Sequence, residues 1–528
     1  MTSYFTITFS FIFLPLSILL YAVAPKRFRW AALLGTSLLF LWHLSRQLTL
    51  MFLASALVVY ACGLGIEALI ARRDRLIVEG TPKKEARASC RRRMRLVLAA
   101  GIVANLLMLF LSKYLAFFCE ITRAVLVPFG VDAPIGIPPI RAPIGISFYT
   151  LMAISYLSDV YRESIPADHH LGRLMLYLCF FPQIMEGPIC RYGQTAEALY
   201  AGEPIKRGRL YEGALRILYG MAKKIIIADR LNLLVETVFD GKAAYDGGII
   251  AFAAILYTIQ LYCDFSGAMD VALGVGRIFN VGLPENFRQP FFSRTASEFW
   301  QRWHITLGAW FKDYVYYPIS LSKGCKRLTS AARKACGNRY GPLLSGGIAL
   351  FCVWFLNGLW HGAGMQYLFF GMYYFVIIMA GGLIEPVAQD LSERWGIDRA
   401  HAPYRVFQTL RTLVVIFVGE LFFRAKGLPR GIELFSTLVG SFSLESFADG
   451  TFLALGLDGH DLLISAAMLV LVLAIGIARE CGKGICRPAA SLPIPARWSV
   501  LIGLFLLIVV FGAYGYGYAP VDPLYAQF

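Results

Sequence analysis

Long apolar runs alternate along this chain with short polar or basic segments. The clearest runs approach the roughly twenty residues that a helix needs to cross a bilayer. They lie at residues 5–23, 48–70, 96–118, 248–275, 414–423 with their upstream flank, 462–477 and 500–516. Because only helices satisfy their own backbone groups in lipid, the pattern predicts an all-α integral membrane protein. We expect roughly ten to twelve membrane segments of this length.

Two basic segments between apolar runs set the predicted orientation. Residues 72–95 and 323–339 are rich in Lys and Arg, and short basic loops beside membrane segments are typical of the cytoplasmic side. Lys26 and Lys483 place the end of the first run and the start of the last run on the same side. Both termini are therefore expected outside the cytoplasm.

The net charge of +16 changes this picture little, because it is concentrated in these loops. The loops fit contact with anionic membrane lipid, or with a cytosolic anionic substrate, and do not indicate nucleic acid. The eleven cysteines are scattered without a C-x-x-C pair, so we expect no metal site.

A change of composition along the chain indicates where the functional region lies. Residues 1–140 are mainly apolar with few interior polar groups, whereas apolar stretches between about 144 and 370 are shorter and are broken by Pro, Gly, Asn, Asp, Arg and His. Such backbone is tolerated at membrane depth where it is buried in protein or lines a cavity. We expect one polytopic domain over 1–528, with N-terminal helices (1–140), a catalytic core (141–425), and C-terminal helices with an external tail (426–528).

Two Trp-rich polar segments each carry a histidine. Residues 298–304 include Arg302, Trp303 and His304, and residues 357–363 run NGLWHGA around His361. Ionisable side chains at bilayer depth are expensive and are read first as functional. A neutral histidine suits general base catalysis near pH 7, and the glycines around His361 let a substrate or another backbone approach closely. His304 fits equally an aromatic belt at the membrane interface.

Two further polar segments lie in the same core. Prolines 182 and 188 cannot share one regular helix, so residues 181–192 predict a re-entrant turn that brings Gln183 to a cavity, or a structural kink with an ion pair. Gln260 and Asp264 share a helix face. Acids there would orient an imidazole or pair with Arg302, and a structural hydrogen-bonding role fits equally well.

In this order, the polar segments resemble the membrane-bound O-acyltransferase family, in its bacterial alginate O-acetylase-like branch. The resemblance rests on residues 181–192, 223–230, 260–270, 284–287, 298–317, 360–363 and 422–425. It implies a ring of tilted and re-entrant helices around a central tunnel in the bacterial cytoplasmic membrane. Glu186 departs from the family pattern, where a small residue is usual, and so does Ala268-Met269, where an aromatic and a hydroxyl residue are usual.

The resemblance also implies an activity. An acyl group, most simply acetyl, passes from a cytosolic thioester such as acetyl-CoA, a substrate rather than a bound cofactor, toward a hydroxyl. The acceptor would be a cell-envelope polysaccharide such as alginate-like exopolysaccharide or peptidoglycan, or an extracytoplasmic esterase-like partner protein. His361 corresponds to the active-site histidine and His304 to the second histidine of this branch. The expected residues for donor binding or tunnel lining are Asn357, Trp360, Trp303, Arg302, Gln183, Asp264 and Lys323.

Three alternatives remain open at this level. Tyr525, near the C-terminus, would relay the acyl group, dock a partner or belong to a frayed end. A related enzyme would transfer D-alanine to teichoic acid from a carrier protein. A transporter would use Glu186, Asp264, Asp270 and the histidines as an ion path, although no paired repeats are visible.

Overall fold

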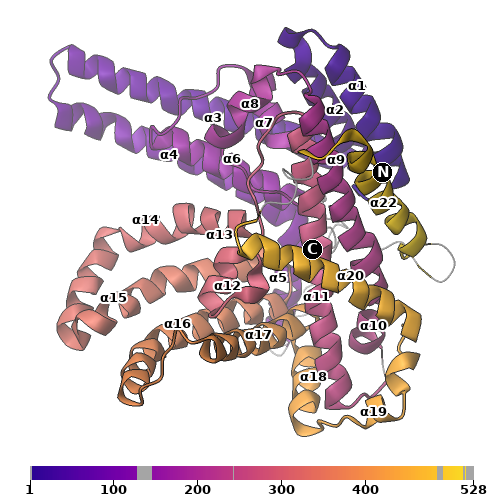
Figure 1. Cartoon of the computed structure of the whole chain (residues 1–528). Helices are drawn as coiled ribbons and strands as arrows, with labels where there is room; N and C mark the ends of the chain where they lie inside the picture. The colour runs from indigo at the N-terminus through magenta and orange to yellow at the C-terminus, as the bar shows by residue number, and fades with distance from the viewer. Residues whose placement is uncertain (1–2, 128–144, 242, 484–490, 515–517, 519–528) are drawn as a thin grey trace. The chain divides into compact units, whose positions relative to one another are not determined.

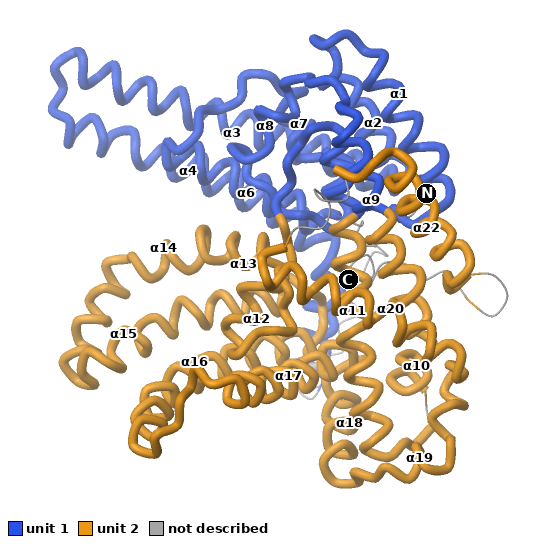
Figure 2. Tube along the Cα trace, viewed as in Figure 1, with its two compact units in different colours: residues 1–217, 271–284, 525–527 blue, residues 218–270, 285–524, 528 orange. Residues whose placement is uncertain are grey.

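Helices dominate the chain, as the apolar pattern predicts. The computed structural model describes residues 3–127, 145–241, 243–483, 491–514 and 518. Within these residues the β-structure is a single isolated bridge between Phe287 and Trp303, so the predicted all-α class is confirmed. The chain divides into two compact units (Figure 2): residues 1–217, 271–284 and 525–527 form unit 1, and residues 218–270, 285–524 and 528 form unit 2.

Unit 1 holds the N-terminal helices. These are α1 (Leu14–Val23), α2 (Arg29–Leu44), α3 (Arg46–Val78), α4 (Lys83–Leu109), α5 (Leu115–Leu126), α6 (Ile146–Tyr161), α7 (Leu171–Cys179) and α8 (Tyr192–Ala201), with most of α9 (Arg207–Ala222). Helices α3 and α4 form a long antiparallel hairpin (Figure 1). The basic segment 72–95 spans the C-terminal end of α3 and the N-terminal end of α4, so it lies at the tip of the hairpin. The apolar parts of both helices lie toward the other end.

The segment between α7 and α8 is a buried turn. It begins after Cys179, and Gln183 within it is fully buried and donates from Nε2 to the Tyr177 carbonyl at 2.6 Å. The Tyr4 hydroxyl donates to the carbonyls of Phe181 and Pro182 at 2.9 and 3.0 Å. The two prolines therefore interrupt the helix as predicted, and Gln183 serves to hold that turn.

Unit 2 contains the remaining helices. They are α10 (Asp229–Asp240), most of α11 (Gly247–Ile278), α12 (Ala296–Arg302), α13 (Ile305–Phe311), α14 (Tyr317–Ser320), α15 (Lys323–His361), α16 (Met365–Arg394), α17 (Ala402–Arg424), α18 (Leu428–Gly440), α19 (Glu445–Ala448), α20 (Gly459–Glu480) and α22 (Ile494–Phe511). Two π-helical turns join them, η5 (Lys223–Ala228) before α10 and η7 (Lys312–Tyr316) before α14.

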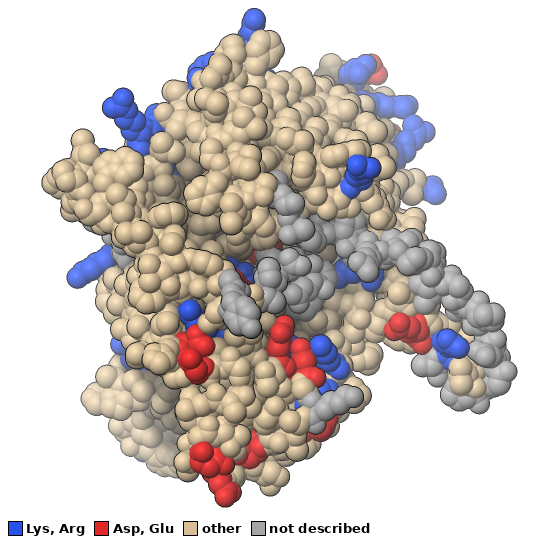
Figure 3. Space-filling view, turned by 90° about the vertical axis from the view of Figure 1, so that its right-hand side faces the viewer, with Lys and Arg blue, Asp and Glu red and all other residues tan. Residues whose placement is uncertain are grey.

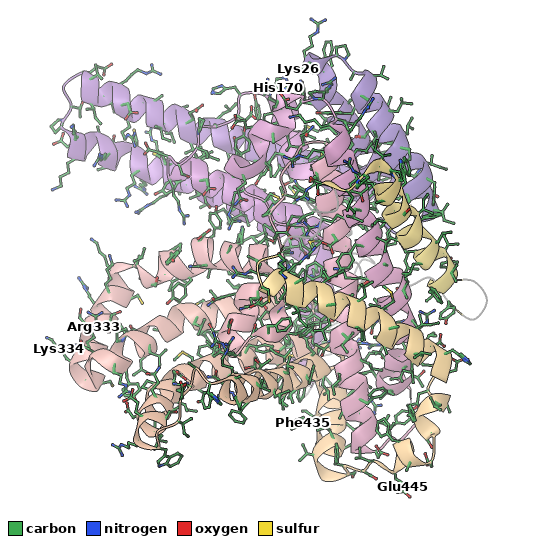
Figure 4. The ribbon with its side chains drawn as sticks, in the orientation of Figure 1. Lys26, His170, Arg333, Lys334, Phe435 and Glu445 are labelled. Atoms are coloured by element: carbon green, nitrogen blue, oxygen red, sulfur yellow. The ribbon has the colours of Figure 1, made fainter. Side chains whose placement is uncertain are left out.

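Helices α15, α16 and α17 lie side by side (Figure 1), and α15 and α16 form a tight hairpin. A Cβ atom on Gly358 would lie 2.5 Å from the Tyr367 carbonyl oxygen, and one on Gly371 would lie 2.3 Å from that of Trp354. Small residues let helix backbones approach closely in membranes. Gly358, three residues before His361, therefore lets the backbone of α16 approach closely. Close approach of a backbone was one of the two expected roles of the glycines around His361. At the opposite end of the hairpin, α15 bends at Gly337, and Arg333 and Lys334 lie there together (Figure 4).

Among the described residues, eight helical stretches are long and apolar enough to cross a membrane. Six of the predicted runs reappear in them, and residues 5–23 give a shorter apolar helix, Phe9–Val23. Helices α15 and α16 were not among the predicted runs, although each contains a stretch apolar enough to cross a membrane. Most of the described residues on the face shown in Figure 3 are neither Lys or Arg nor Asp or Glu.

Candidate active site

A cavity of about 350 Å³ in unit 2 brings the two histidines together. His304 and His361 both line it, although 56 positions separate them in the chain. Most of the wall is apolar, from Leu307, Leu350 and Val353 among others. A concave, largely apolar pocket with a few converging polar groups is the usual form of a ligand site.

The cavity runs along one face of α15. His361, Asn357, Trp354 and Leu350 follow each other at helical spacing on that face. The path from Leu350 to His361 is about 16 Å long at the rise of an α-helix. Helix α13 and the turn η7 line the facing side of the cavity, and their chain direction is opposite to that of α15. The Tyr316 hydroxyl lies 3.3 Å from where a Cβ on Gly346 would be, and Lys312, one turn earlier, lines the cavity.

Aromatic rings surround the His361 side chain. It is the last residue of α15, and its ring lies 5.1 Å from that of Phe423, 5.7 Å from that of Phe370 and 5.0 Å from that of Trp360. The same Trp360 ring lies 5.5 Å from the His304 ring. Trp360 thus contacts both imidazoles.

His304 lies in an unusual backbone conformation. It stands between α12 and α13 with φ 47° and ψ 51°, in the left-handed region that non-glycine residues seldom adopt. The bridge between Phe287 and Trp303 and a hydrogen bond from the Ile305 N–H to the Asn286 carbonyl at 3.0 Å hold it there. Strained residues of this kind cluster at functional sites.

The His304 ring is also held from several sides. The Phe265 ring of α11 meets it edge-on at 4.8 Å, and its Nδ1 lies 3.3 Å from Oδ1 of Asn286. The side chain is 3 % exposed, and this burial lowers the pKa of His304 to about 3. The ring is therefore neutral near pH 7.

Asn357 has unused hydrogen-bonding capacity. It lines the cavity one helical turn before His361 and is 8 % exposed. Its Oδ1 is buried and has no hydrogen-bond partner within the described part of the chain. Buried polar atoms in this state call for an explanation, and a bound substrate supplies one.

The structure places the other expected residues in different environments. Trp303 lines the cavity, and Trp360 lies between the histidines. Arg302 turns away, because its guanidinium pairs with Glu298 at 2.7 Å and Glu480 at 2.9 Å. It lines a separate cavity with these two acids.

Three further candidates lie away from the histidines. Gln183 is buried in its own turn in unit 1. Lys323 is exposed at the first position of α15, on the arm before Gly337, which folds back so that Cys325 lies 3.5 Å from the Ser345 carbonyl of the arm that ends at His361. Tyr525 lies outside the described residues.

Asp264 belongs to a buried group of charges between η5 and α11. Lys224 Nζ lies 2.7 Å from Asp264 and 2.6 Å from Asp229, while Lys223 Nζ lies 2.7 Å from Asp270 and donates to the Ser266 hydroxyl at 2.7 Å. Burial acts to lower the pKa of Lys224, but the two carboxylates outweigh it and raise that pKa. Asp264 is therefore an ion-pair partner of Lys224, and the structure does not place it beside Arg302 or among the residues that line the cavity.

Sequence reasoning missed several residues that line the cavity. Trp300, Gln301, Lys312 and Trp354 do so, and Asn286 contacts His304 from behind. The spacing of Trp354 to His361 was a usable signal, since residues on one helix face line the same wall. Trp300 gave no such signal, because α12 ends before His304.

The family follows from comparison with known proteins. The model of the membrane-bound O-acyltransferase family matches residues 161–335. The probable alginate O-acetylase AlgI of Pseudomonas aeruginosa is 32% identical over 430 residues, which cover 81% of this chain and 73% of that protein. This chain belongs to the membrane-bound O-acyltransferase family. It is a multi-pass membrane O-acyltransferase, and family membership decides for the enzyme over the transporter.

Other members of the family are also similar to it. A peptidoglycan O-acetyltransferase of Helicobacter pylori is 27% identical over 66% of this chain and 65% of that protein. A teichoic acid D-alanyltransferase of Bacillus subtilis is 27% identical over 61% of this chain and 75% of its own length. This O-acyltransferase thus resembles relatives that are named for different acyl groups and acceptors.

Proposed function

We propose that the enzyme transfers an acetyl group from a cytosolic thioester, acetyl-CoA, toward a hydroxyl of a cell-envelope polysaccharide. The transfer would pass directly or through an extracytoplasmic partner protein. The observation that carries this proposal is the single cavity lined by His304, His361 and Asn357 in an acyltransferase. The similarity to an alginate O-acetylase and a peptidoglycan O-acetyltransferase supports the acceptor class.

The chemistry needs a base and a group that stabilises negative charge. His361 would take the proton from the acceptor hydroxyl as its oxygen attacks the thioester carbonyl. The side-chain amide of Asn357, one turn away on α15, would donate to the oxyanion that forms. Collapse of the tetrahedral intermediate breaks the carbon–sulfur bond, and the thiolate leaves with the proton held by His361.

The cavity wall favours acetyl over D-alanyl transfer. The described residues that line it include His304, His361 and Lys312 but no carboxylate. The ammonium group of a D-alanyl thioester would enter an apolar space without a counter-ion, which is unfavourable. A neutral acetyl group meets no such penalty.

Substitution of His361 tests the proposal. With purified protein in lipid nanodiscs and radiolabelled acetyl-CoA, we expect His361→Ala to lower acetyl transfer by about 10²- to 10⁴-fold, the usual contribution of general base catalysis. His460→Ala is the matched control, because that side chain is 92% exposed. Transfer by His361→Ala at the rate of the control would overturn the role of His361.

A further inference from the structure

The side-chain amide of Asn286 lies at the centre of the contacts behind His304. It is 1 % exposed, and its Oδ1 lies 3.0 Å from the Thr306 backbone nitrogen and 2.9 Å from the Thr306 hydroxyl. The same oxygen lies 3.3 Å from Nδ1 of His304. The other end of the amide, Nδ2, faces the thioether of Met269 at 3.3 Å.

These contacts fix which end of the amide faces the histidine. A backbone N–H can only donate, so the Asn286 atom that faces the Thr306 nitrogen must be the oxygen. Reversal of the amide would set its NH₂ group against that N–H. The Nδ2 group then donates to the Met269 sulfur, a weak acceptor.

The orientation of the amide determines the position of the proton on His304. An amide oxygen cannot donate, so the ring nitrogen that faces it must carry the hydrogen. A neutral imidazole has one N–H and one lone pair. With the proton on Nδ1, the lone pair lies on Nε2.

We propose that Asn286 is a positioning residue that holds His304 as the Nδ1-protonated tautomer, so that Nε2 is a hydrogen-bond acceptor for an N–H or O–H group of the substrate. The part that concerns the substrate rests on the proposed acyl transfer. A lone pair cannot stabilise an oxyanion, so that task falls to the Asn357 amide. His304 instead holds a substrate group that carries a proton.

The surroundings of His304 keep the ring in this pose. Asn286 also accepts the Ile305 N–H with its backbone carbonyl, which fixes the left-handed turn at His304. Phe265 and Trp360 contact the ring at 4.8 and 5.5 Å. Phe265 and Met269 are one helical turn apart on α11, so one face of that helix supports both the imidazole and the amide.

The tautomer is measured directly by ¹⁵N NMR of histidine-labelled protein in nanodiscs, without any assay of activity. The resonances that disappear in His304→Gln belong to His304. We expect a protonated Nδ1 in the wild type and in Asn286→Asp, whose carboxylate keeps an acceptor at the same place. In Asn286→Leu we expect a shift toward the Nε2-protonated form. Asn232→Leu, which removes another buried amide that pairs with Gln260, should leave the signal unchanged.

The second measurement is the pH profile of acetyl transfer. A carboxylate beside Nδ1–H favours protonation of the ring, so Asn286→Asp should move the loss of activity at low pH upward by about one pH unit or more. If the side chain at position 286 did not face the His304 ring, its replacement by Asp would lower activity equally at every pH.

The possible outcomes are distinct. An Nε2-protonated His304 in the wild type overturns the role of Asn286, and so does a pH profile of Asn286→Asp that matches that of the wild type. If the tautomer is found as expected but the wild-type protein transfers no acyl group, the proposed function fails and the substrate-facing role of Nε2 fails with it, while the positioning by Asn286 stands.

Discussion

At the scale of single residues, the site is defined by how two imidazoles are held. His361 ends a helix among aromatic rings, while His304 lies in a strained turn with its Nδ1 against an amide oxygen. Neutral imidazole offers a lone pair at physiological pH, whereas a protonated ring does not. The burial that keeps His304 neutral therefore serves the chemistry and also makes stability depend on pH.

The lowered pKa of His304 predicts acid sensitivity of the fold. In the unfolded chain His304 has a pKa of about 6.5 and binds a proton below that pH. In the folded chain its pKa is about 3, so the ring stays neutral until the pH falls to that value. Its contribution to stability is thus present above pH 6.5 and is lost as the pH falls. Between pH 7 and pH 5 the loss is about 2 kcal/mol.

When the pH falls from 7 to 5, we expect His304→Gln to lose less stability than the wild type. The free energy or midpoint of unfolding in detergent measures this loss. His460→Gln is the control, since its exposed ring should leave the acid sensitivity unchanged. Equal pH dependence of His304→Gln and the wild type would contradict the burial argument.

At the scale of elements, helix α11 links two features of unit 2. One side carries Asp264 and Asp270 toward the lysines of η5, and another carries Phe265 and Met269 toward His304 and Asn286. The most apolar 18-residue window of α11 is 72% buried, against 17% for α16. A helix enclosed in this way can hold charged pairs that a lipid-facing helix cannot.

The lysine of this group is expected to stabilise the fold strongly. Lys224→Met would leave Asp264 and Asp229 buried without their cation, and breaking a buried pair in this way costs about 3–5 kcal/mol. Thermal unfolding in detergent measures the loss. Lys426→Met is the matched control, because that lysine is 70% exposed in its pair with Asp240 and should change stability by less than about 0.5 kcal/mol. Equal effects of the two substitutions would refute the argument.

At the scale of the whole molecule, membrane orientation is the property most open to a direct test. Arg333 and Lys334 lie near the bend at Gly337, at the end of the α15–α16 hairpin opposite to His361, and the positive-inside rule predicts that this end is in the cytoplasm. The donor would then reach His361 along the groove beside α15.

Two native cysteines report on this orientation. Cys336 and Cys481 are exposed, near the basic segment and at the end of α20. In single-cysteine variants, a membrane-impermeant maleimide should label both only after the cells are opened. Labelling of either residue in intact spheroplasts would contradict the predicted topology.

The sequence by itself determined the all-helical membrane class and singled out the segments that we propose carry the chemistry. Apolar runs of membrane length have few physical alternatives, and histidines among tryptophans and glycines are rare in lipid-facing sequence. The sequence also indicated the family, which the comparisons confirmed. The predicted runs left out α15 and α16, although each contains an apolar stretch of membrane length.

Only the tertiary structure decided which residues share the cavity. Sequence spacing relates residues a few positions apart, so it could not show that Trp300 lines the wall, that Arg302 pairs with Glu480, or that Lys224 pairs with Asp264. The contact between Asn286 and His304 depends on a bridge between segments that fold back on each other. The identity of the two histidines was readable from the chain, and the way each ring is held depends on packing over long sequence distances.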